Sequence, residues 1–217
     1  MKLILSSAGF TTEEIVKTCE RLAGIPRQRL NVAIINEAYA VEHDNNLRWV
    51  LDDLNRVRDT FGGNLELVNI LALDKQTVMQ RLNLADMIFV TGGNTDYLMD
   101  VLSRQGIFDI LPELLKTKLY VGSSAGAMVM GKRLSSEGYR TIYGEDSSYP
   151  VKDYAGYIDV SILPHLDSPH FHNRRAKIDE LAQNYHGTLY GLRDDSAIVV
   201  EDDILTTIGS EPYIVRA

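Results

Sequence analysis

The stretch Leu119–Met130, LYVGSSAGAMVM, places a Gly-x-Ser-x-Gly motif between two short apolar segments. The residues before Gly122 predict a strand, and those after Gly126 predict the start of a helix. A serine on such a sharp turn needs small residues two positions to either side to avoid clashes. Only Ser124 has glycine at both positions, so we expect Ser124, rather than Ser123, to project above the carboxyl edge of a sheet.

Short apolar runs alternate with amphipathic segments over the first two-thirds of the chain. The expected strands cover residues 2–5, 32–35, 65–70, 87–90 and 119–121. Apolar residues between them recur at helical spacing, and the single Cys19 lies in one of these stripes, where it is expected to pack in the core. Apolar strands separated by helices predict an α/β three-layer sandwich with a mostly parallel sheet.

The last third of the chain has a different pattern. One helix is expected over residues 178–185, followed by short strands at 188–191, 196–200 and 204–208 that are joined by tight acidic turns. No internal repeat or linker interrupts the sequence, so we expect residues 1–217 to form a single domain.

Composition narrows the possible partners and the compartment. The formal net charge of −8 argues against nucleic acid or an anionic membrane surface as a partner. No apolar run is long enough to cross a bilayer, and a single cysteine fits a reducing compartment. These features predict a cytoplasmic protein, monomer or homodimer, that acts on a small molecule or another protein.

A catalytic serine needs a base, and His165 is the best placed of the five histidines. It follows the apolar run 160–164, so it leaves a buried strand where Ser124 is also expected to emerge. By contrast, His186 lies beside a glycine at a helix end, and His43 lies in a polar stretch that reads as exposed.

The same segment holds a competing set of metal-ligand residue types: His165, Asp167, His170 and His172. Pro164 and Pro169 argue against a regular helix that would present them on one face, and no H-E-x-x-H motif is present. We therefore expect no metal and no organic cofactor.

A second glycine turn, Thr91-Gly92-Gly93-Asn94, follows the strand expected at residues 87–90. The two glycines let the backbone approach a ligand closely, so one N–H of this turn is able to complete an oxyanion hole. Alternatively, Asn94 caps the following helix. Both roles are compatible.

Together, the serine turn, the Gly-Gly-Asn turn and His165 resemble the peptidase E family over nearly the whole chain. That family includes aspartyl dipeptidases and the related cyanophycinases. Its fold is similar to class I glutamine amidotransferases and is flavodoxin-like. The elbow Gly122–Met130 looks closer to the cyanophycinase side of the family.

The resemblance implies roles for individual residues. Ser124 is the nucleophile, His165 the base, and Gly93 with the N–H of Ala125 the oxyanion hole. Substrate contacts are expected from Asn94 and from a basic residue after the histidine. Arg174 is the nearest match for that residue, and Arg175 is beside it; the alternative is that both arginines belong to a solvated helix start.

The sequence departs from the family pattern at the third member of the triad. The dipeptidases carry an aspartate where this chain has Tyr139. A carboxylate is needed to orient the histidine, and we predict Glu137 for this role. The other candidates for this third position are Glu145, Asp146 and Asp159.

These features predict a serine exopeptidase that hydrolyses short peptides, with Asp-X dipeptides as the expected substrates. One alternative is a cyanophycinase-like peptidase acting on isoaspartyl links. Another is a catalytically silent module that binds an acidic metabolite on the same fold. An amidotransferase domain is disfavoured because it needs a cysteine at the elbow, and Cys19 lies elsewhere.

Overall fold

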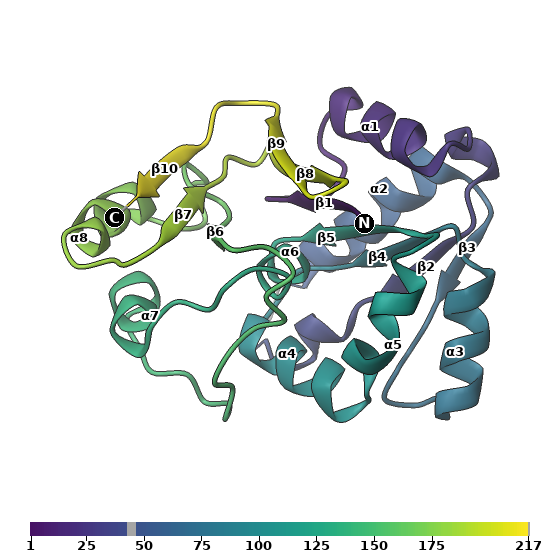
Figure 1. Ribbon diagram of the computed structural model, residues 1–217, viewed down its shortest axis with the longest axis horizontal. Helices are drawn as coiled ribbons and strands as arrows, with labels where there is room; N and C mark the ends of the chain where they lie inside the picture. Colours follow the sequence, from purple (N-terminus) through teal and green to yellow (C-terminus); the bar gives the residue numbers. More distant parts are fainter. Residues whose placement is uncertain (43–46, 217) are drawn as a thin grey trace.

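The computed structural model describes residues 1–42 and 47–216, and its strands form two sheets (Figure 1). The larger sheet has the strand order β3-β2-β4-β5-β1-β8-β9. Its strands are β1 (Lys2–Ser6), β2 (Val32–Ile35), β3 (Leu65–Leu67), β4 (Met87–Val90), β5 (Leu119–Ser123), β8 (Ala197–Glu201) and β9 (Ile204–Ile208). Strands β1 to β5 pair in parallel, whereas β8 and β9 extend the sheet in antiparallel fashion. The expected mostly parallel α/β sheet is confirmed.

Helices cover both faces of this sheet (Figure 1). The helices are α1 (Glu13–Ala23) and α2 (Arg48–Phe61) on one face, and α3 (Lys75–Leu84), α4 (Thr95–Arg104) and α5 (Ile107–Leu114) on the other. Short 3₁₀ turns cover Arg27–Arg29 and Glu37–Val41. Cys19 is fully buried in the core between α1, α2 and the sheet, where burial raises the pKa of its thiol. It is a packing residue, as predicted.

A second, smaller sheet forms beyond the carboxyl edge of the first. It contains β6 (Ser161–Leu163), β7 (Thr188–Gly191) and β10 (Tyr213–Arg216) in the order β10-β7-β6, with β6 and β7 parallel. It packs with α7 (Ser136–Tyr143) and α8 (Arg174–Ala182) around a separate apolar core. The sequence predicted a buried strand over residues 160–164 at the sheet edge where Ser124 emerges. The buried strand β6 is present, but it belongs to this second sheet, because strand partners far apart in the chain are not visible in local sequence.

Two element boundaries also differ from the prediction. Strand β3 ends at Leu67 rather than at residue 70. Beyond it the N–H of Ile70 donates to the Glu37 carboxylate at 2.5 Å instead of to a neighbouring strand. Helix α8 begins at Arg174 and ends at Ala182, four residues earlier at its start than predicted. The Glu37 acceptor explains the end of β3, and the left-handed backbone of Asn173 explains the start of α8. Neither feature changes the spacing of apolar residues, so neither could be predicted from it.

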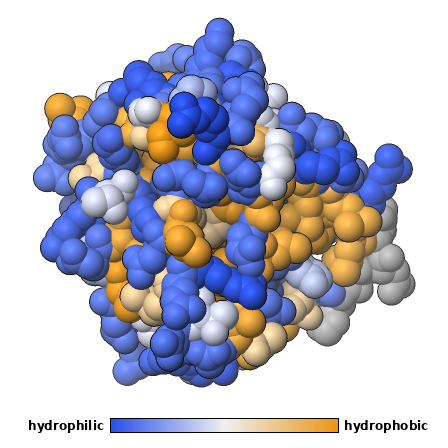
Figure 2. Space-filling view, turned by 90° about the vertical axis from the view of Figure 1, so that its right-hand side faces the viewer, coloured by the Kyte–Doolittle hydropathy of each residue, from blue (hydrophilic) through white to orange (hydrophobic). Residues whose placement is uncertain are grey.

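The face that carries β3 exposes several apolar side chains. Figure 2 shows hydrophobic surface gathered on this side of the molecule. The large exposed apolar residues of the chain include Leu51 on α2, Leu67 on β3 and Leu84 on α3. Among the helices in the described ranges, none is long and apolar enough to cross a membrane.

Candidate active site

Ser124 sits on a strained turn between β5 and the short helix α6 (Ala125–Met128). Its backbone angles are φ 49° and ψ −109°, a conformation that side-chain-bearing residues rarely adopt. A Cβ on Gly122 would lie 2.3 Å from the carbonyl oxygen of Gly126. One on Gly126 would lie 2.2 Å from the carbonyl oxygen of Val90. The two glycines are therefore required by packing, and the predicted nucleophile elbow is formed.

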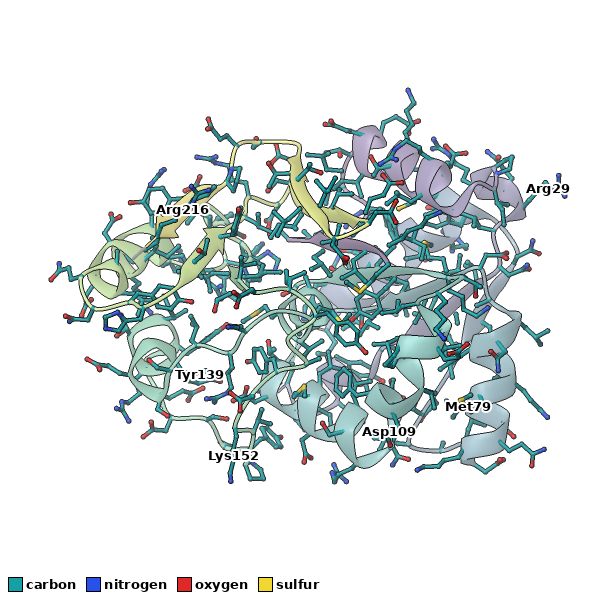
Figure 3. The ribbon with its side chains drawn as sticks, in the orientation of Figure 1. Arg29, Met79, Asp109, Tyr139, Lys152 and Arg216 are labelled. Atoms are coloured by element: carbon teal, nitrogen blue, oxygen red, sulfur yellow. The ribbon has the colours of Figure 1, made fainter. Side chains whose placement is uncertain are left out.

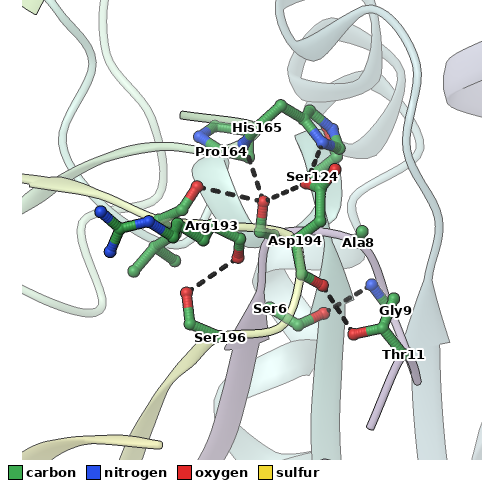
Figure 4. Close-up of polar contacts among 12 residues, drawn as sticks. Ser6, Ala8, Gly9, Thr11, Ser124, Pro164, His165, Arg193, Asp194 and Ser196 are labelled. Carbon is green, nitrogen blue, oxygen red and sulfur yellow. Dashed lines mark hydrogen bonds and ion pairs between the residues drawn. The ribbon is translucent and has the colours of Figure 1, made fainter. Parts of the chain in front are cut away.

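His165 lies directly against the serine (Figure 4). Its Nε2 is 3.0 Å from Ser124 Oγ, and its Nδ1 is 2.6 Å from Asp194 Oδ1. The imidazole stacks on the Phe171 ring, with centroids 4.7 Å apart and planes 10° from parallel. The predicted pair of Ser124 and His165 is brought together, and Asp194 completes a serine–histidine–carboxylate triad.

Asp194 was missed by the sequence analysis, and strand pairing explains its position. Strands β6 and β7 run parallel with Leu163 opposite Gly191, so the segments after both strands emerge at one edge. His165 follows β6 and Asp194 follows β7. The acidic turn containing Asp194 could be recognised in the sequence. Its proximity to His165 depends on the pairing of β6 with β7, which could not be recognised there.

Buried Ser7 joins the base to its carboxylate. The backbone N–H of His165 donates to Ser7 Oγ at 2.7 Å, and the Ser7 hydroxyl lies 3.0 Å from Asp194 Oδ1. A second side chain, Thr11, donates to the Asp194 carbonyl at 2.6 Å. Burial opposes the charge of Asp194, but hydrogen bonds from His165 and Ser7 hold its carboxyl pKa below the usual value. Asp194 is therefore poised as an ionised partner for the imidazole.

Glu137 does not take the predicted third position. It is exposed on α7, where it lines a polar cavity of about 510 Å³ to which none of the three triad residues contributes. Tyr139, at the position where the family aspartate was expected, lies on the same helix (Figure 3). Its ring centroid is 4.5 Å from that of Tyr143, with the ring planes tilted by 36°. The prediction of Glu137 is corrected to Asp194.

The other carboxylates considered for this role are engaged or exposed elsewhere. Asp146 accepts from Arg140 at 2.9 Å, and Asp159 pairs with Lys132. Glu145 is exposed just after α7.

The Gly92-Gly93 turn lies against Ser124. A Cβ on Gly92 would be 3.1 Å from the Ser124 Cβ, and one on Gly93 would be 2.3 Å from the Ala38 carbonyl oxygen. Gly93 has φ 135°, which glycine adopts readily. Ala125 begins α6 immediately after the serine. Within residues 1–42 and 47–216, no hydrogen bond engages the backbone N–H of Gly93 or Ala125.

The family model for Peptidase family S51 matches residues 3–208. The chain belongs to peptidase family S51. It is 29% identical to Peptidase E of Haemophilus influenzae (strain PittGG) over 142 residues, which are 60% of this chain and 57% of that protein. An uncharacterized peptidase of Listeria monocytogenes is 32% identical over 70% of this chain and 73% of its own length. The chain thus spans less than two-thirds of the Haemophilus relative.

Solved structures of similar proteins agree with the fold. A putative peptidase E from Listeria monocytogenes superposes with a TM-score of 0.75 at 24% identity, covering 97% of this chain and 98% of that one. A peptidase from an acI-B1 actinobacterium gives a TM-score of 0.70 at 17% identity, covering 99% and 90%. The S51 fold therefore extends over nearly the whole chain.

The two arginines predicted for this S51 family member lie in different surroundings. Arg174 is only 5% exposed, and its Nη1 donates to the Pro164 carbonyl at 2.8 Å. Its guanidinium carbon lies 4.3 Å from the centre of the Phe171 ring, the ring that stacks on His165. Arg175 is exposed and stacks on Tyr213 instead, 4.8 Å from the ring centre. Arg174 alone is brought next to the triad.

Burial lowers the pKa of the Arg174 guanidinium, partly offset by Tyr143 and by the charge of Asp194. None of the ion pairs found between described residues includes Arg174. A nearly buried cation without a paired carboxylate favours an anionic group in its neighbourhood.

Asn94 and the histidine-rich segment have local structural contacts. The Asn94 side chain caps α4 by accepting from the Tyr97 N–H at 2.9 Å, as the capping alternative predicted. Asp167 pairs with Arg193 at 2.6 Å. No group of three metal-ligating side chains occurs in the part of the chain that the structure describes. His43, predicted to be exposed, lies outside the described residues.

Proposed function

We propose that this S51 family member is a serine exopeptidase that cleaves short peptides through an acyl-enzyme on Ser124. The observation that carries the proposal is the continuous contact from Ser124 Oγ through His165 to Asp194, at 3.0 and 2.6 Å. This is the arrangement that makes an otherwise weak hydroxyl nucleophilic.

In the proposed reaction, Ser124 Oγ attacks the scissile carbonyl carbon while His165 Nε2 takes the hydroxyl proton. Asp194 holds the Nδ1–H and stabilises the imidazolium that forms. The N–H groups of Gly93 and Ala125 are the proposed donors to the oxyanion of the tetrahedral intermediate. His165 then returns the proton to the leaving amine, and water, activated by the same imidazole, hydrolyses the ester.

We further propose a preference for an acidic amino-terminal residue, as in Asp-X dipeptides. Arg174 supports this preference, because it is a buried cation beside the triad whose charge is not paired with a carboxylate among the described ion pairs. We place Arg175 outside the substrate site, since it stacks on Tyr213. We propose that the chain acts in the cytoplasm without a metal or organic cofactor.

Labelling with a fluorophosphonate, followed by peptide mapping, tests the nucleophile. We expect one adduct on Ser124, none in Ser124→Ala, and slow labelling in His165→Ala. Folded wild-type protein that takes no label, or Ser124→Ala that keeps turnover, would contradict the proposal.

Substrate preference is tested with Asp-Leu against its neutral isostere Asn-Leu. A charge-assisted hydrogen bond from Arg174 predicts a kcat/KM ratio above about ten in favour of Asp-Leu. Equal hydrolysis of both dipeptides would remove the acidic preference and leave the serine mechanism in place.

A further inference from the structure

The amino-terminal end of α2 lies at the same edge of the sheet as Ser124. Helix α2 connects the parallel strands β2 and β3, so it runs antiparallel to them and begins at their carboxyl ends. Asp53 and Arg56 lie in the second and third turns from this end. Arg56 Nη1 donates to the Ala8 carbonyl at 3.2 Å.

Ala8 belongs to the loop that supports the triad. Its neighbour Ser7 contacts both His165 and Asp194, and the Ser6 carbonyl accepts the Ser124 N–H at 3.1 Å. Figure 4 draws Ala8 with the triad residues. Arg56 therefore fixes the first half of α2, including Asp53, against the loop beneath the catalytic groups.

Among the residues that the structure describes, few groups compensate the charge of Asp53. One Oδ1 contact of 3.2 Å to Arg56 Nη1 is its ion pair in the described structure, and that same nitrogen also serves Ala8. The side chain is only 20% exposed. Burial raises the pKa of the Asp53 carboxyl to about 6, partly offset by Arg56 and His165, while Asp52 and Asp194 raise it further.

A peptide bound for cleavage after its first residue brings a cation to this region. Its α-ammonium is attached to the carbon next to the scissile carbonyl, so it lies close to Ser124 and His165 when the carbonyl is attacked. A partly buried carboxylate with one long ion-pair contact is stabilised by a second cation, because the added charge offsets the cost of its desolvation.

From this placement we infer that Asp53 binds the free α-ammonium of the substrate's first residue and restricts the peptidase to unblocked amino termini. The inference rests on the proposed function and sharpens it. Asp53 and Arg174 then recognise opposite charges of one zwitterionic residue, the ammonium and the side-chain carboxylate. An N-acetylated peptide keeps the contact of its side-chain carboxylate with Arg174 and loses the contact of its ammonium with Asp53.

The test compares Asp-Leu with N-acetyl-Asp-Leu. We expect wild-type kcat/KM to favour the free dipeptide, and Asp53→Asn to reduce that ratio by about ten- to one hundred-fold, chiefly through KM for the free dipeptide. A misfolded or mispositioned site lowers both rates without changing their ratio. Asp52→Asn is the matched control, since its neighbouring carboxylate is 54% exposed, and it should keep the wild-type ratio.

Binding to a Ser124→Ala background separates this inference from the proposed function. Titration calorimetry should give tighter binding of Asp-Leu than of N-acetyl-Asp-Leu in Ser124→Ala, and equal binding in Ser124→Ala with Asp53→Asn. Unchanged discrimination in the double variant, or no discrimination in Ser124→Ala, overturns the role of Asp53 whether or not the wild-type chain hydrolyses either peptide. Failure of fluorophosphonate labelling bears on the serine mechanism alone.

Discussion

Ser124 comes from the seven-stranded sheet, whereas His165 and Asp194 come from loops that follow two strands of the smaller sheet. The serine is held by backbone packing: glycines at 122 and 126 leave no room for a side chain, and Gly92 lies against its Cβ. Two buried hydroxyls also hold this turn: Ser6 Oγ donates to the Gly122 carbonyl at 3.1 Å, and the Tyr120 hydroxyl donates to the Gly126 carbonyl at 2.7 Å.

His165 and Asp194 are held mainly by hydrogen bonds from segments far away in the chain. His165 has a positive φ of 61°, its N–H donates to Ser7, and its ring is fixed between Asp194 and Phe171. Ser7 belongs to the first sheet's loop, so one buried hydroxyl ties the two halves together. Close packing around glycines thus dominates the placement of Ser124, whereas hydrogen bonds between distant segments dominate the placement of His165.

Removal of the Asp194 carboxylate should have the largest effect on the hydrogen-bonded placement of His165. Asp194→Asn should lower kcat by about 10³- to 10⁴-fold, because the amide favours the wrong tautomer of His165. Steady-state kinetics on a cleaved peptide measure the loss, with circular dichroism as the fold control. Glu137→Gln is the matched variant and should stay within about two-fold of wild type. Similar losses in both variants would contradict the assignment of Asp194.

One added methyl group should disrupt the close packing that places Ser124. Gly126→Ala puts a Cβ 2.2 Å from the Val90 carbonyl oxygen, so the turn must shift. We expect a loss of about 2–4 kcal/mol in the free energy of unfolding, measured by urea denaturation, together with loss of fluorophosphonate labelling. Gly63→Ala is the control, because no atom lies within 4 Å of its added Cβ, and its stability should change by less than about 0.5 kcal/mol. A stable, fully labelled Gly126→Ala would show that packing does not set the elbow.

Ser7→Ala tests the link between the halves. It leaves the buried His165 N–H without its acceptor and removes one contact from Asp194, which should cost about 1–3 kcal/mol and lower kcat about ten-fold or more. Loss of the Asp194 contact should also shift the acidic limb of the kcat/KM pH profile, which a global loss of stability would leave in place. Thr11→Val is the comparison, since Thr11 contacts only the Asp194 carbonyl among these groups, and its profile should stay near that of wild type. An unshifted profile in Ser7→Ala would assign Ser7 to packing alone.

The contrast between local packing at Ser124 and long-range contacts at His165 also explains what could be predicted from the sequence. The elbow, the parallel sheet and buried Cys19 follow from glycine spacing and apolar periodicity, which are local features. His165 could be found because it follows an apolar run. Asp194 could not, because its place beside His165 depends on the parallel pairing of β6 with β7, and several acidic residues follow short strands in this chain.

Asp53 extends the comparison to stability, because burial of a carboxyl near the triad has a pH-dependent cost that the strained turn at Ser124 does not have. Burial raises the pKa of its carboxyl to about 6, above the value of about 3.9 in an unfolded chain. Between these values the folded protein keeps a proton that the unfolded chain has lost, so the free energy of unfolding falls as pH rises through about 4 to 6. Asp53→Asn is neutral throughout.

The stability of Asp53→Asn relative to wild type should therefore grow from near zero at about pH 4 to about 1–2 kcal/mol at about pH 7, allowing for solvent screening. Urea unfolding at several pH values measures this difference, and Asp52→Asn should show only a smaller trend in the same direction, because it removes one of the charges that raise the pKa of Asp53. A stability difference that is independent of pH would contradict the raised pKa. A variant that is more stable yet no longer distinguishes free from acetylated amino termini would show that the carboxylate is kept for binding, since its burial works against the fold.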